Sequence, residues 1–269
     1  MAADVAAIAG EALAAIDGGR QLAPFSARYP GFELDDGYRV TAAMRGKRLA
    51  RGERMLGRKI GFTNRTIWAE YGVYAPMWGY VYDTTVHDLA GLGVFPLHGL
   101  AEPRIEPEIV FGLSRAPAQG MDDAALIGCV EWIAHGFELV QSIFPGWAFA
   151  AADTVAAYGL HGALLVGQRV AVAPDLSRWK ASLPAFGIAL SCDGASMEEG
   201  SGAHVLDGPL AALRHLVSVL EASPDQQPLG AGEIVTTGTL TRALPVQAGQ
   251  TWSTRLDGID LPGARVQFR

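Results

Sequence analysis

Three glutamates are the residues of this chain whose types and spacing most directly suggest chemistry. Glu106 and Glu108 lie two positions apart in a strand-like run, and Glu138 lies in a second such run, residues 136–140. Alternation along a strand places Glu106 and Glu108 on one face. Neighbouring carboxylates repel each other unless a cation or water separates them. The set therefore predicts a site for a hard divalent ion such as Mg²⁺ or Mn²⁺. The alternative is a solvated acidic strand edge beside an unrelated buried acid.

A lysine and a histidine are further candidates for catalysis. Lys59 lies between Gly57 and Gly61, which allow a ligand to approach the backbone closely. Its ammonium could pair with a substrate carboxylate or move a proton, although a lysine that extends to solvent from a strand end is the alternative. His161 lies in a glycine-flanked loop, a common position for site residues. No pair among the six histidines has metal-ligand spacing.

A run of hydroxyl residues, TTGTLT at 236–241, includes Thr239 and a glycine at the end of an expected strand. Such a segment could offer backbone N–H groups to an anion, and an ordinary β-turn is the alternative. The chain has no G-x-S-x-G nucleophile elbow, no P-loop and no G-x-G-x-x-G motif after a strand. Nucleotide binding therefore has no support in the sequence.

The elements that must position these residues follow from apolar spacing and capping residues. Helices are expected over residues 3–16, 35–51, 64–71, 122–133, 148–158 and 210–220. Strands are expected over residues 57–63, 79–86, 104–113, 137–140, 164–172, 187–192, 234–237, 252–256 and 265–268. Because helices and strands are intermixed without a strict βαβ rhythm, the predicted class is α+β. We expect an N-terminal helical layer over residues 1–55 and a β-rich catalytic core over residues 56–269, within one continuous fold.

Composition limits the classes of partner. The chain has 269 residues, of which 49% are hydrophobic, so it can bury a sizeable core. A net charge of −7 argues against nucleic-acid or anionic-membrane surfaces. Cys129 and Cys192 form no disulfide framework or zinc spacing. The N-terminal run lacks the basic start of a signal peptide, and no run reaches the roughly 18 apolar residues that span a bilayer. We expect a cytoplasmic protein with no nucleic-acid or membrane partner.

Several short motifs occur in a fixed order through most of the chain. They are GRKIGFT at 57–63, YGV at 71–73 followed by P-x-x-G at 76–79, RIEPEIVF at 104–111, FELV at 137–140, ADTVA at 152–156, GTLT at 238–241 and GQT at 249–251. Together they resemble the 2-keto-4-pentenoate hydratase / 2-oxo-3-hexenedioate decarboxylase family of the fumarylacetoacetate hydrolase superfamily.

This resemblance implies a fumarylacetoacetase C-terminal-like mixed β-roll core, usually in a homo-oligomer. It implies a metal, Mg²⁺ (or Mn²⁺), held by Glu106, Glu108 and Glu138, with Lys59 near a small-molecule 2-oxo acid substrate. His161 is kept as a second catalytic candidate. The substrate-binding positions that we expect around them are Phe62, Met77, Trp78, Arg104, Tyr158 and Thr239.

Two segments depart from the family pattern. Hydratases of the family typically have an acid in Pro-Asp-x-Gly, and here that place is taken by Met77, as in the decarboxylase branch. After Asp153-Thr154, the family often has Ala-Asp-Asn and small polar residues, and here residues 156–161 read AAYGLH. Trp78, Tyr80 and Tyr158 would make the pocket more aromatic if they face inward.

The resemblance implies a lyase, and we expect a Mg²⁺-dependent hydratase that acts on a 2-oxo-enoate or 2-hydroxydienoate of aromatic-compound catabolism. The alternative is a 2-oxo-3-hexenedioate (4-oxalocrotonate) decarboxylase, because loss of CO₂ from a vinylogous β-keto acid leaves the same kind of dienolate. A further alternative is an acylpyruvate-type C–C hydrolase, which needs a His–Glu pair for which His161 is the candidate. The last alternative is a non-catalytic homologue that keeps the fold.

Overall fold

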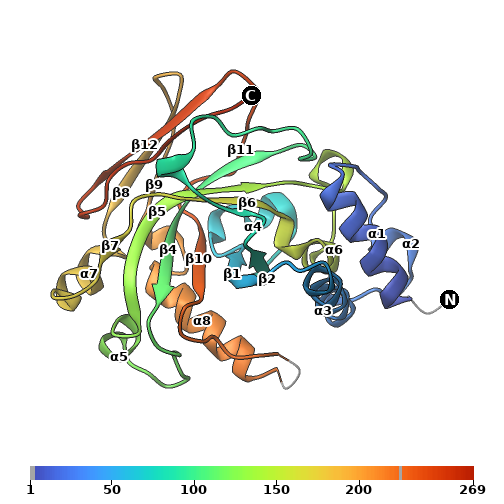
Figure 1. Cartoon of the computed structure of the whole chain (residues 1–269), viewed down its shortest axis with the longest axis horizontal. Helices are drawn as coiled ribbons and strands as arrows, with labels where there is room; N and C mark the ends of the chain where they lie inside the picture. Colours follow the sequence, from blue (N-terminus) through green and yellow to red (C-terminus); the bar gives the residue numbers. More distant parts are fainter. Residues whose placement is uncertain (1–3, 224–225) are drawn as a thin grey trace.

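A strongly curved nine-stranded sheet forms the centre of the molecule (Figure 1). The computed structural model describes residues 4–223 and 226–269. The main strand order is β2-β1-β10-β4-β5-β6-β3, with β11 paired to β4 and β7 paired to β5. The strands are β1 (Met55–Gly61), β2 (Met77–Tyr82), β3 (Val86–Asp88), β4 (Arg104–Leu113), β5 (Val130–Val140), β6 (His161–Val166), β7 (Val170–Ala171), β10 (Ile234–Thr239) and β11 (Leu244–Pro245).

The two longest strands, β4 and β5, are antiparallel neighbours in the middle of this sheet. Their apolar side chains are buried on both faces, which is why neither strand reads as a simple apolar–polar alternation. On β4, Ile105, Ile109 and Phe111 alternate to one face and are fully buried. Glu106, Glu108 and Val110 share the other face.

A second, four-stranded sheet packs against the first. Its order is β13-β12-β8-β9, with β8 (Gly187–Cys192), β9 (Ala195–Ser201), β12 (Thr251–Asp257) and β13 (Arg265–Gln267). Trp252 and Leu190 of this sheet join Ile105, Phe137 and Leu139 of the first in one apolar cluster. The β-rich core is therefore two layers of sheet whose strands come from both halves of the chain.

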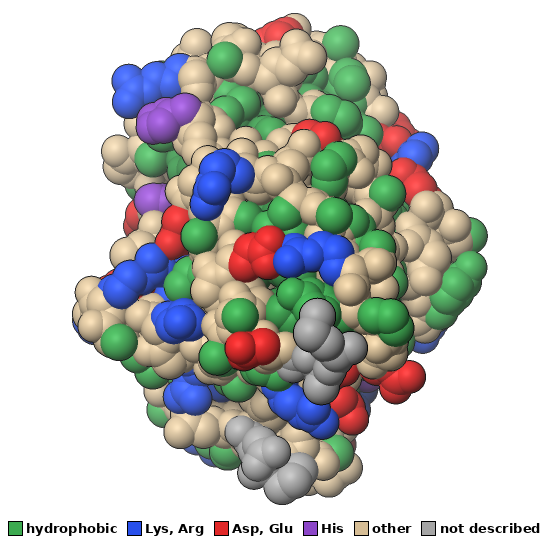
Figure 2. All heavy atoms as spheres, turned by 90° about the vertical axis from the view of Figure 1, so that its right-hand side faces the viewer, with side chains coloured by type: hydrophobic (Ala, Val, Ile, Leu, Met, Phe, Trp, Pro, Cys, Tyr) green, Lys and Arg blue, Asp and Glu red, His purple; other side chains and the backbone are tan. Residues whose placement is uncertain are grey.

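Helices cover one side of the curved sheet. The N-terminal layer consists of α1 (Val5–Asp17), α2 (Phe25–Arg28) and α3 (Leu34–Ala50), with α6 (Ala151–Ala156) from the later chain packed against α3. Thr41 of α3 donates a hydrogen bond of 2.6 Å to the carbonyl of Val155. Gly37 allows this approach, because a Cβ there would lie 2.6 Å from the carbonyl oxygen of Ala152. On the face that carries this layer, acidic and basic side chains are interspersed with apolar ones (Figure 2).

The remaining helices are α4 (Trp68–Tyr71), α5 (Asp123–Ile127), α7 (Leu176–Ser182) and α8 (Pro209–Glu221). Of these, α5 and α8 lie at the bottom of the view in Figure 1, α7 lies at its left, and α4 lies near its middle. As the sequence predicts, Leu213, Leu216 and Leu220 of α8 are buried on one side. Asn64 caps the turn before α4, and Gly72 ends that helix with a φ of 63°.

One expected helix is wrong over half of its length. The pattern at 122–133 predicts a helix, but α5 ends at Ile127 and β5 begins at Val130. Residues 135 and 136, which follow the expected helix, also lie inside the strand. Val130 and Ile133 pair with Leu113 and Phe111 of β4, so pairing with a distant strand overrides the local helical spacing. The expected strand at 164–172 is also divided, into β6 and β7.

In the part of the chain that the structure describes, none of the helices combines the length and the apolar character that crossing a membrane requires.

Candidate active site

Strand pairing brings the three predicted glutamates together. Glu106 on β4 lies directly opposite Glu138 on β5, and Glu108 pairs with Gly136 on one side and Thr239 on the other. One carboxylate oxygen from each glutamate lies within 4.8 Å of the others. Glu108 and Glu138 are fully buried, and Glu106 is partly exposed. The spacing in the sequence therefore corresponds to one cluster in space.

Glu108 is held by the end of β10. The Thr236 hydroxyl and the Gly238 backbone N–H, the latter at 2.8 Å, both donate to its Oε2 atom. Gly238 has a φ of 101°, and a Cβ there would collide with the Thr63 hydroxyl. The TTGTLT segment thus binds an anion, as its sequence suggests, but that anion is the carboxylate of Glu108. The other oxygen, Oε1, is buried without a hydrogen-bond donor among the described residues.

Glu138 has two basic neighbours, which are the two catalytic candidates of the sequence. Lys59 Nζ lies 3.0 Å from Oε2, and His161 Nδ1 lies 2.7 Å from Oε1. Lys59 also donates a 2.8 Å hydrogen bond to the carbonyl of Gly159. The second ring nitrogen of His161 is 2.9 Å from the Thr85 hydroxyl. Both candidates therefore contact a glutamate of the cluster.

The three carboxylates have different acidities because their surroundings differ. Burial is the largest cause that raises the pKa of Glu106, to about 7, and the charge of Glu138 adds to it. Burial, followed by the charges of Glu138 and Glu106, raises the pKa of Glu108 well above its usual value. At Glu138, burial also opposes ionisation, but Lys59 and His161 outweigh it and lower the pKa.

The pKa values of the two basic groups, Lys59 and His161, shift in opposite directions. Burial acts to lower the pKa of Lys59, but the neighbouring glutamates outweigh burial and raise it, so the ammonium stays charged. Burial lowers the pKa of His161, which favours the neutral imidazole. One ammonium thus faces three carboxylates.

These residues fit a hard divalent cation. The donors are carboxylate oxygens, which Mg²⁺ and Mn²⁺ prefer. Glu108 Oε1 has no donor among the described residues, and Glu138 Oε2 is charge-paired with Lys59 but accepts no hydrogen bond of normal geometry. A cation would neutralise carboxylates that otherwise resist ionisation together. Three protein ligands would leave other coordination positions for a substrate.

A narrow pocket extends from Lys59 and Glu106. Three aromatic side chains form much of its wall: Phe62 and Tyr71, whose ring centres are 6.0 Å apart, and Trp147, whose ring centre is 6.2 Å from that of Tyr71. The space between the side chains is about 20 Å³ for the centres of water molecules, enough for one or two. The three aromatic residues of the wall are partly exposed.

The predicted substrate-binding residues are divided between this pocket and other places. Phe62 and Thr239 line the pocket. Arg104 does not line the pocket itself, but its Nη1 donates a 2.6 Å hydrogen bond to the hydroxyl of Tyr71, which does. Met77 is buried, and its sulfur accepts a hydrogen bond from Thr154.

Trp78 and Tyr158, two of the expected substrate-binding residues, do not line this pocket, and neither does Tyr80. Trp78 pairs with Ile60, and Lys59 pairs with Gly79, so alternation turns Trp78 to the opposite face. There it stacks on Tyr38 with ring centres 5.3 Å apart. The hydroxyl of Tyr158 lies 3.3 Å from that of Tyr82, in a separate cavity beyond His161.

Several residues of the site were missed by sequence reasoning. Tyr71 lies within the YGV motif, so a signal for it existed. Trp147 has no motif and reaches the pocket from a turn in which it takes a φ of 58°. Thr85 and the Gly159 carbonyl act as partners of His161 and Lys59. Only the folded chain brings these segments together.

The chain is similar in sequence to several proteins with named activities. No family model matches the chain. A 2-hydroxyhexa-2,4-dienoate hydratase of Comamonas testosteroni is 28% identical over 91% of this chain and 90% of its own length. A 2-keto-4-pentenoate hydratase of Burkholderia vietnamiensis is 30% identical over 90% of this chain and 89% of its own. A 4-oxalocrotonate decarboxylase of Pseudomonas sp. (strain CF600) is 28% identical over 88% and 87%.

Solved structures share the fold. A 4-oxalocrotonate decarboxylase from Pseudomonas putida G7, complexed with magnesium and adipate, superposes with a TM-score of 0.88 at 24% identity, covering 98% of this chain and 97% of that chain. Fumarylpyruvate hydrolase from Pseudomonas aeruginosa, in complex with Mn²⁺ and pyruvate, gives 0.58 at 14% identity over 80% and 89%. These likenesses confirm the predicted α+β fold of fumarylacetoacetase type. With the sequence relatives, they show that the chain belongs to the 2-keto-4-pentenoate hydratase / 2-oxo-3-hexenedioate decarboxylase family of the fumarylacetoacetate hydrolase superfamily.

Proposed function

We propose that this protein is a Mg²⁺-dependent hydratase that acts on a 2-oxo-enoate or 2-hydroxydienoate of aromatic-compound catabolism. The observation that carries the proposal is the cluster of Glu106, Glu108 and Glu138, with the Lys59 ammonium, at one end of a mostly apolar pocket. Relatives named as hydratases support this reaction class. The assembly implied by the family, a homo-oligomer, remains a prediction.

The roles of the protein groups follow from their positions. Mg²⁺ held by the three glutamates would supply a Lewis acid for the carboxylate and 2-oxo oxygens of the substrate. Lys59, held by Glu138 and the Gly159 carbonyl, presents a charged ammonium to the same end of the pocket. It pairs with the substrate carboxylate or delivers a proton to the carbon chain. His161, as a neutral imidazole, donates to Glu138 and so fixes the orientation of that carboxylate.

Decarboxylation is the second candidate, and one observation favours it. The place of the hydratase acid is taken by Met77, whose sulfur is buried against Thr154, so no carboxylate is available there as a base for adding water. Relatives named as decarboxylases support this candidate. Loss of CO₂ does not require that base.

The ultraviolet absorbance of two substrates tests the proposal. Purified protein is mixed with 2-hydroxypenta-2,4-dienoate and, separately, with 2-oxo-3-hexenedioate, first with Mg²⁺ and then with EDTA. Loss of the dienoate signal only with Mg²⁺ is the expected result. Consumption of the hexenedioate with release of CO₂, without dienoate hydration, would replace the hydratase by the decarboxylase.

Matched variants connect this turnover to the cluster. Glu106→Gln keeps the shape of the side chain but removes one charge, so Mg²⁺-dependent turnover should fall at least about a hundredfold while thermal unfolding stays cooperative. Glu131→Gln changes an exposed glutamate on the same strand as Glu138 and serves as the control. Full activity of the Glu106 variant would overturn the assignment of the metal centre.

A further inference from the structure

One hydroxyl group in the aromatic wall of the pocket is able to donate its hydrogen to a substrate. We propose that Tyr71 is a further catalytic residue, which gives its proton to the terminal carbon of the substrate, and that the charge of Arg104 stabilises the tyrosinate that this step leaves. The inference rests on the proposed function, since it needs a 2-hydroxydienoate as the substrate. It assigns the proton transfer to Tyr71 and leaves Lys59 to pair with the substrate carboxylate.

The hydrogen of the Tyr71 hydroxyl has no partner in the described part of the chain. Besides Glu106, the described side chains of the pocket wall that can donate a hydrogen bond are Lys59, Tyr71, Trp147 and Thr239. Three of these already donate to backbone carbonyls, Lys59 at 2.8 Å, Trp147 at 3.1 Å and Thr239 at 3.0 Å. The Tyr71 oxygen instead accepts a hydrogen bond. A phenol can accept and donate at once, so this group can still donate into the pocket.

Arg104 holds the oxygen of Tyr71. Alternation along β4 places Arg104 on the same face as Glu106, and its charge acts on that carboxyl. Its Nη1 donates a 2.6 Å hydrogen bond to the Tyr71 hydroxyl. A hydrogen bond from a cation strengthens the donor that receives it, and a nearby positive charge favours the ionised form of a phenol. The guanidinium therefore assists the loss of a proton from Tyr71.

Burial keeps the Tyr71 hydroxyl intact at neutral pH. It is the largest cause that raises the pKa of Tyr71, to about 12, and the charge of Arg104 acts in the opposite direction. A proton donor must hold its proton before the reaction, and this phenol does. The ring is fixed by aromatic neighbours, since it stacks on Phe149 with ring centres 6.0 Å apart and meets Phe62 and Trp147 at 6.0 and 6.2 Å.

Tyr71 is also near enough to the carboxylates to reach a short substrate. The charges of Arg104 and Glu106 both act on it, so its hydroxyl lies within electrostatic reach of the cluster. A five-carbon 2-oxo acid that binds through its carboxylate and 2-oxo group has its terminal carbon only three bonds beyond the 2-oxo carbon. A donor for that carbon must therefore lie close to the cluster, and a donor held in one position makes the transfer efficient.

The step balances for 2-hydroxypenta-2,4-dienoate. The O–H bond of Tyr71 breaks as the electron pair of the terminal double bond forms a C–H bond at carbon 5, and the 2-hydroxyl group releases its proton to solvent and becomes the 2-oxo group. Water then adds to carbon 4, and the tyrosinate takes the proton that this water loses. Carbon 3 takes one proton from solvent. Tyr71 thus also serves as the base that is missing at Met77.

Tyr71→Phe tests the proton transfer directly. It removes the hydroxyl and keeps the ring, so Mg²⁺-dependent loss of the 2-hydroxypenta-2,4-dienoate signal should fall at least about a hundredfold. 2-Oxopentanoate has the same length but no double bond to hydrate. Its dissociation constant, measured by isothermal titration calorimetry of the Mg²⁺-loaded protein, should change by less than about threefold.

Tyr74→Phe is the matched control. It makes the same change three residues away, at a side chain that is 67% exposed and does not line the pocket. Turnover and binding should equal those of the wild type. Full turnover in Tyr71→Phe would overturn the inference. A loss of 2-oxopentanoate binding as large as the loss of turnover would overturn it as well, because a packing role alone weakens both.

A double-mutant cycle tests the part of Arg104. Arg104→Met removes the charge and should lower turnover at least about tenfold, and Arg104→Lys should recover part of this loss, because it keeps a cationic donor. In the Tyr71→Phe background, Arg104→Met should cost little further turnover, since its effect acts through the hydroxyl. Equal losses in both backgrounds would exclude this role of Arg104.

Failure of this inference differs from failure of the proposed function. If the wild-type protein with Mg²⁺ neither binds 2-oxopentanoate nor consumes the dienoate or the hexenedioate, the proposed function is wrong. If it consumes only the hexenedioate, the hydration step is absent and the inference is excluded together with the hydratase. If the wild type hydrates the dienoate and Tyr71→Phe is equally active, the reaction class survives and only the proton donor is wrong.

Discussion

Glu106, Glu108 and Glu138 carry the same functional group in three different environments. Glu138 has Lys59 and His161 as partners, and its pKa is lowered. Glu108 accepts from Thr236 and Gly238 yet has a raised pKa, because it is fully buried beside two other carboxylates. Glu106 has a pKa of about 7 and is the one partly exposed member. Protonation of Glu106 and of Glu108 therefore competes with a metal near neutral pH.

The affinity for Mg²⁺ should depend on pH through Glu106 and Glu108. Below pH 7 the metal-free protein holds a proton on the carboxyl of Glu106, since its pKa is raised to about 7, and binding must release that proton. Above that pH the carboxylate is already charged. The dissociation constant should therefore decrease by up to about tenfold per pH unit for each proton released as the pH rises from 6 to 7. Calorimetry in two buffers with different ionisation enthalpies measures both the affinity and the number of protons released.

Glu131, an exposed glutamate on β5, is the control that distinguishes a change at the cluster from a general change in charge. The Glu131→Gln variant should keep the pH dependence of the wild type. A Mg²⁺ affinity that is constant from pH 6 to 8 in the wild-type protein would contradict the assignment of the titrating groups to the glutamate cluster.

At the scale of elements, the turn η4 (Tyr158–Leu160) connects the helical layer to the site. Its three residues have φ values of 56°, 62° and 67°, which places two non-glycine residues in the left-handed region. Such a conformation costs free energy and persists where the surroundings fix it. Here the turn directs the Gly159 carbonyl to Lys59 and starts β6 at His161, so one short segment positions both partners of Glu138.

Gly159→Ala tests this positioning. The native φ of +62° is unfavourable for alanine, and the added Cβ would lie 3.3 Å from Cδ of Lys59. The variant should lose about 1 kcal/mol of unfolding free energy, and its turnover should decrease at least about tenfold because the ammonium is displaced. Thermal or denaturant unfolding and the absorbance assay measure the two effects.

Gly120→Ala separates backbone cost from the contact with Lys59. Gly120 has a φ of +81° and no heavy atom within 4 Å of an added Cβ. This variant should lose a similar amount of stability and retain full activity. If both variants lose activity in proportion to their stability, η4 has no positioning role.

Features that depend on one strand could be predicted from the sequence, whereas features that depend on pairing between distant strands could not. Glu106 and Glu108 could be placed on one face because alternation is a property of a single strand. Trp78 could not be assigned to a face, because its side depends on pairing with Ile60 of a different strand. Likewise, the pattern at 122–133 favours a helix until β4 is present as a partner for β5. Residues that act only as partners, such as Thr85, are visible only after the strands assemble.

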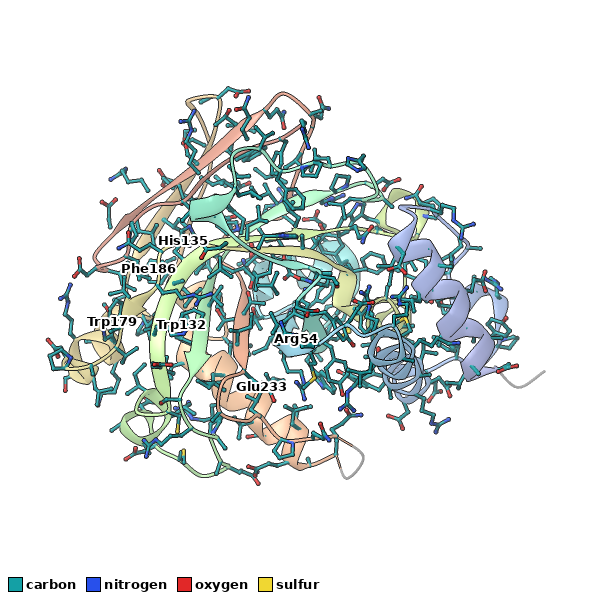
Figure 3. The ribbon with its side chains drawn as sticks, in the orientation of Figure 1. Arg54, Trp132, His135, Trp179, Phe186 and Glu233 are labelled. Atoms are coloured by element: carbon teal, nitrogen blue, oxygen red, sulfur yellow. The ribbon has the colours of Figure 1, made fainter. Side chains whose placement is uncertain are left out.

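At the scale of the whole molecule, His135 joins the two sheets (Figure 3). Its Nδ1–H donates to the Glu108 carbonyl at 3.0 Å, since a carbonyl only accepts, and Nε2 then accepts from the Thr254 hydroxyl at 2.8 Å. Thr254 belongs to β12 of the second sheet. Burial lowers the pKa of His135 to about 4. The neutral ring is therefore part of the packing that supports the strand behind the carboxylates.

Acid should weaken this junction. In the unfolded chain a histidine takes up a proton below about pH 6.5, whereas folded His135 resists protonation until about pH 4. Its contribution to stability is therefore present above pH 6.5 and is lost as the pH falls toward 4, by up to about 3 kcal/mol. Denaturant unfolding at several pH values should show a smaller acid-induced decrease in a His135→Gln variant than in the wild type. Equal slopes in both proteins would contradict this account.

The direct opposition of Glu106 and Glu138 in the sheet has an evolutionary consequence. A single residue gained or lost inside β4 or β5 would shift the register and turn every later side chain to the other face, so the carboxylates would separate. The connection between the two strands, residues 114–129, carries no such constraint. Length changes in the part of that connection before buried Leu126 and Ile127 of α5 leave the register intact, whereas insertions and deletions within either strand should be eliminated by selection.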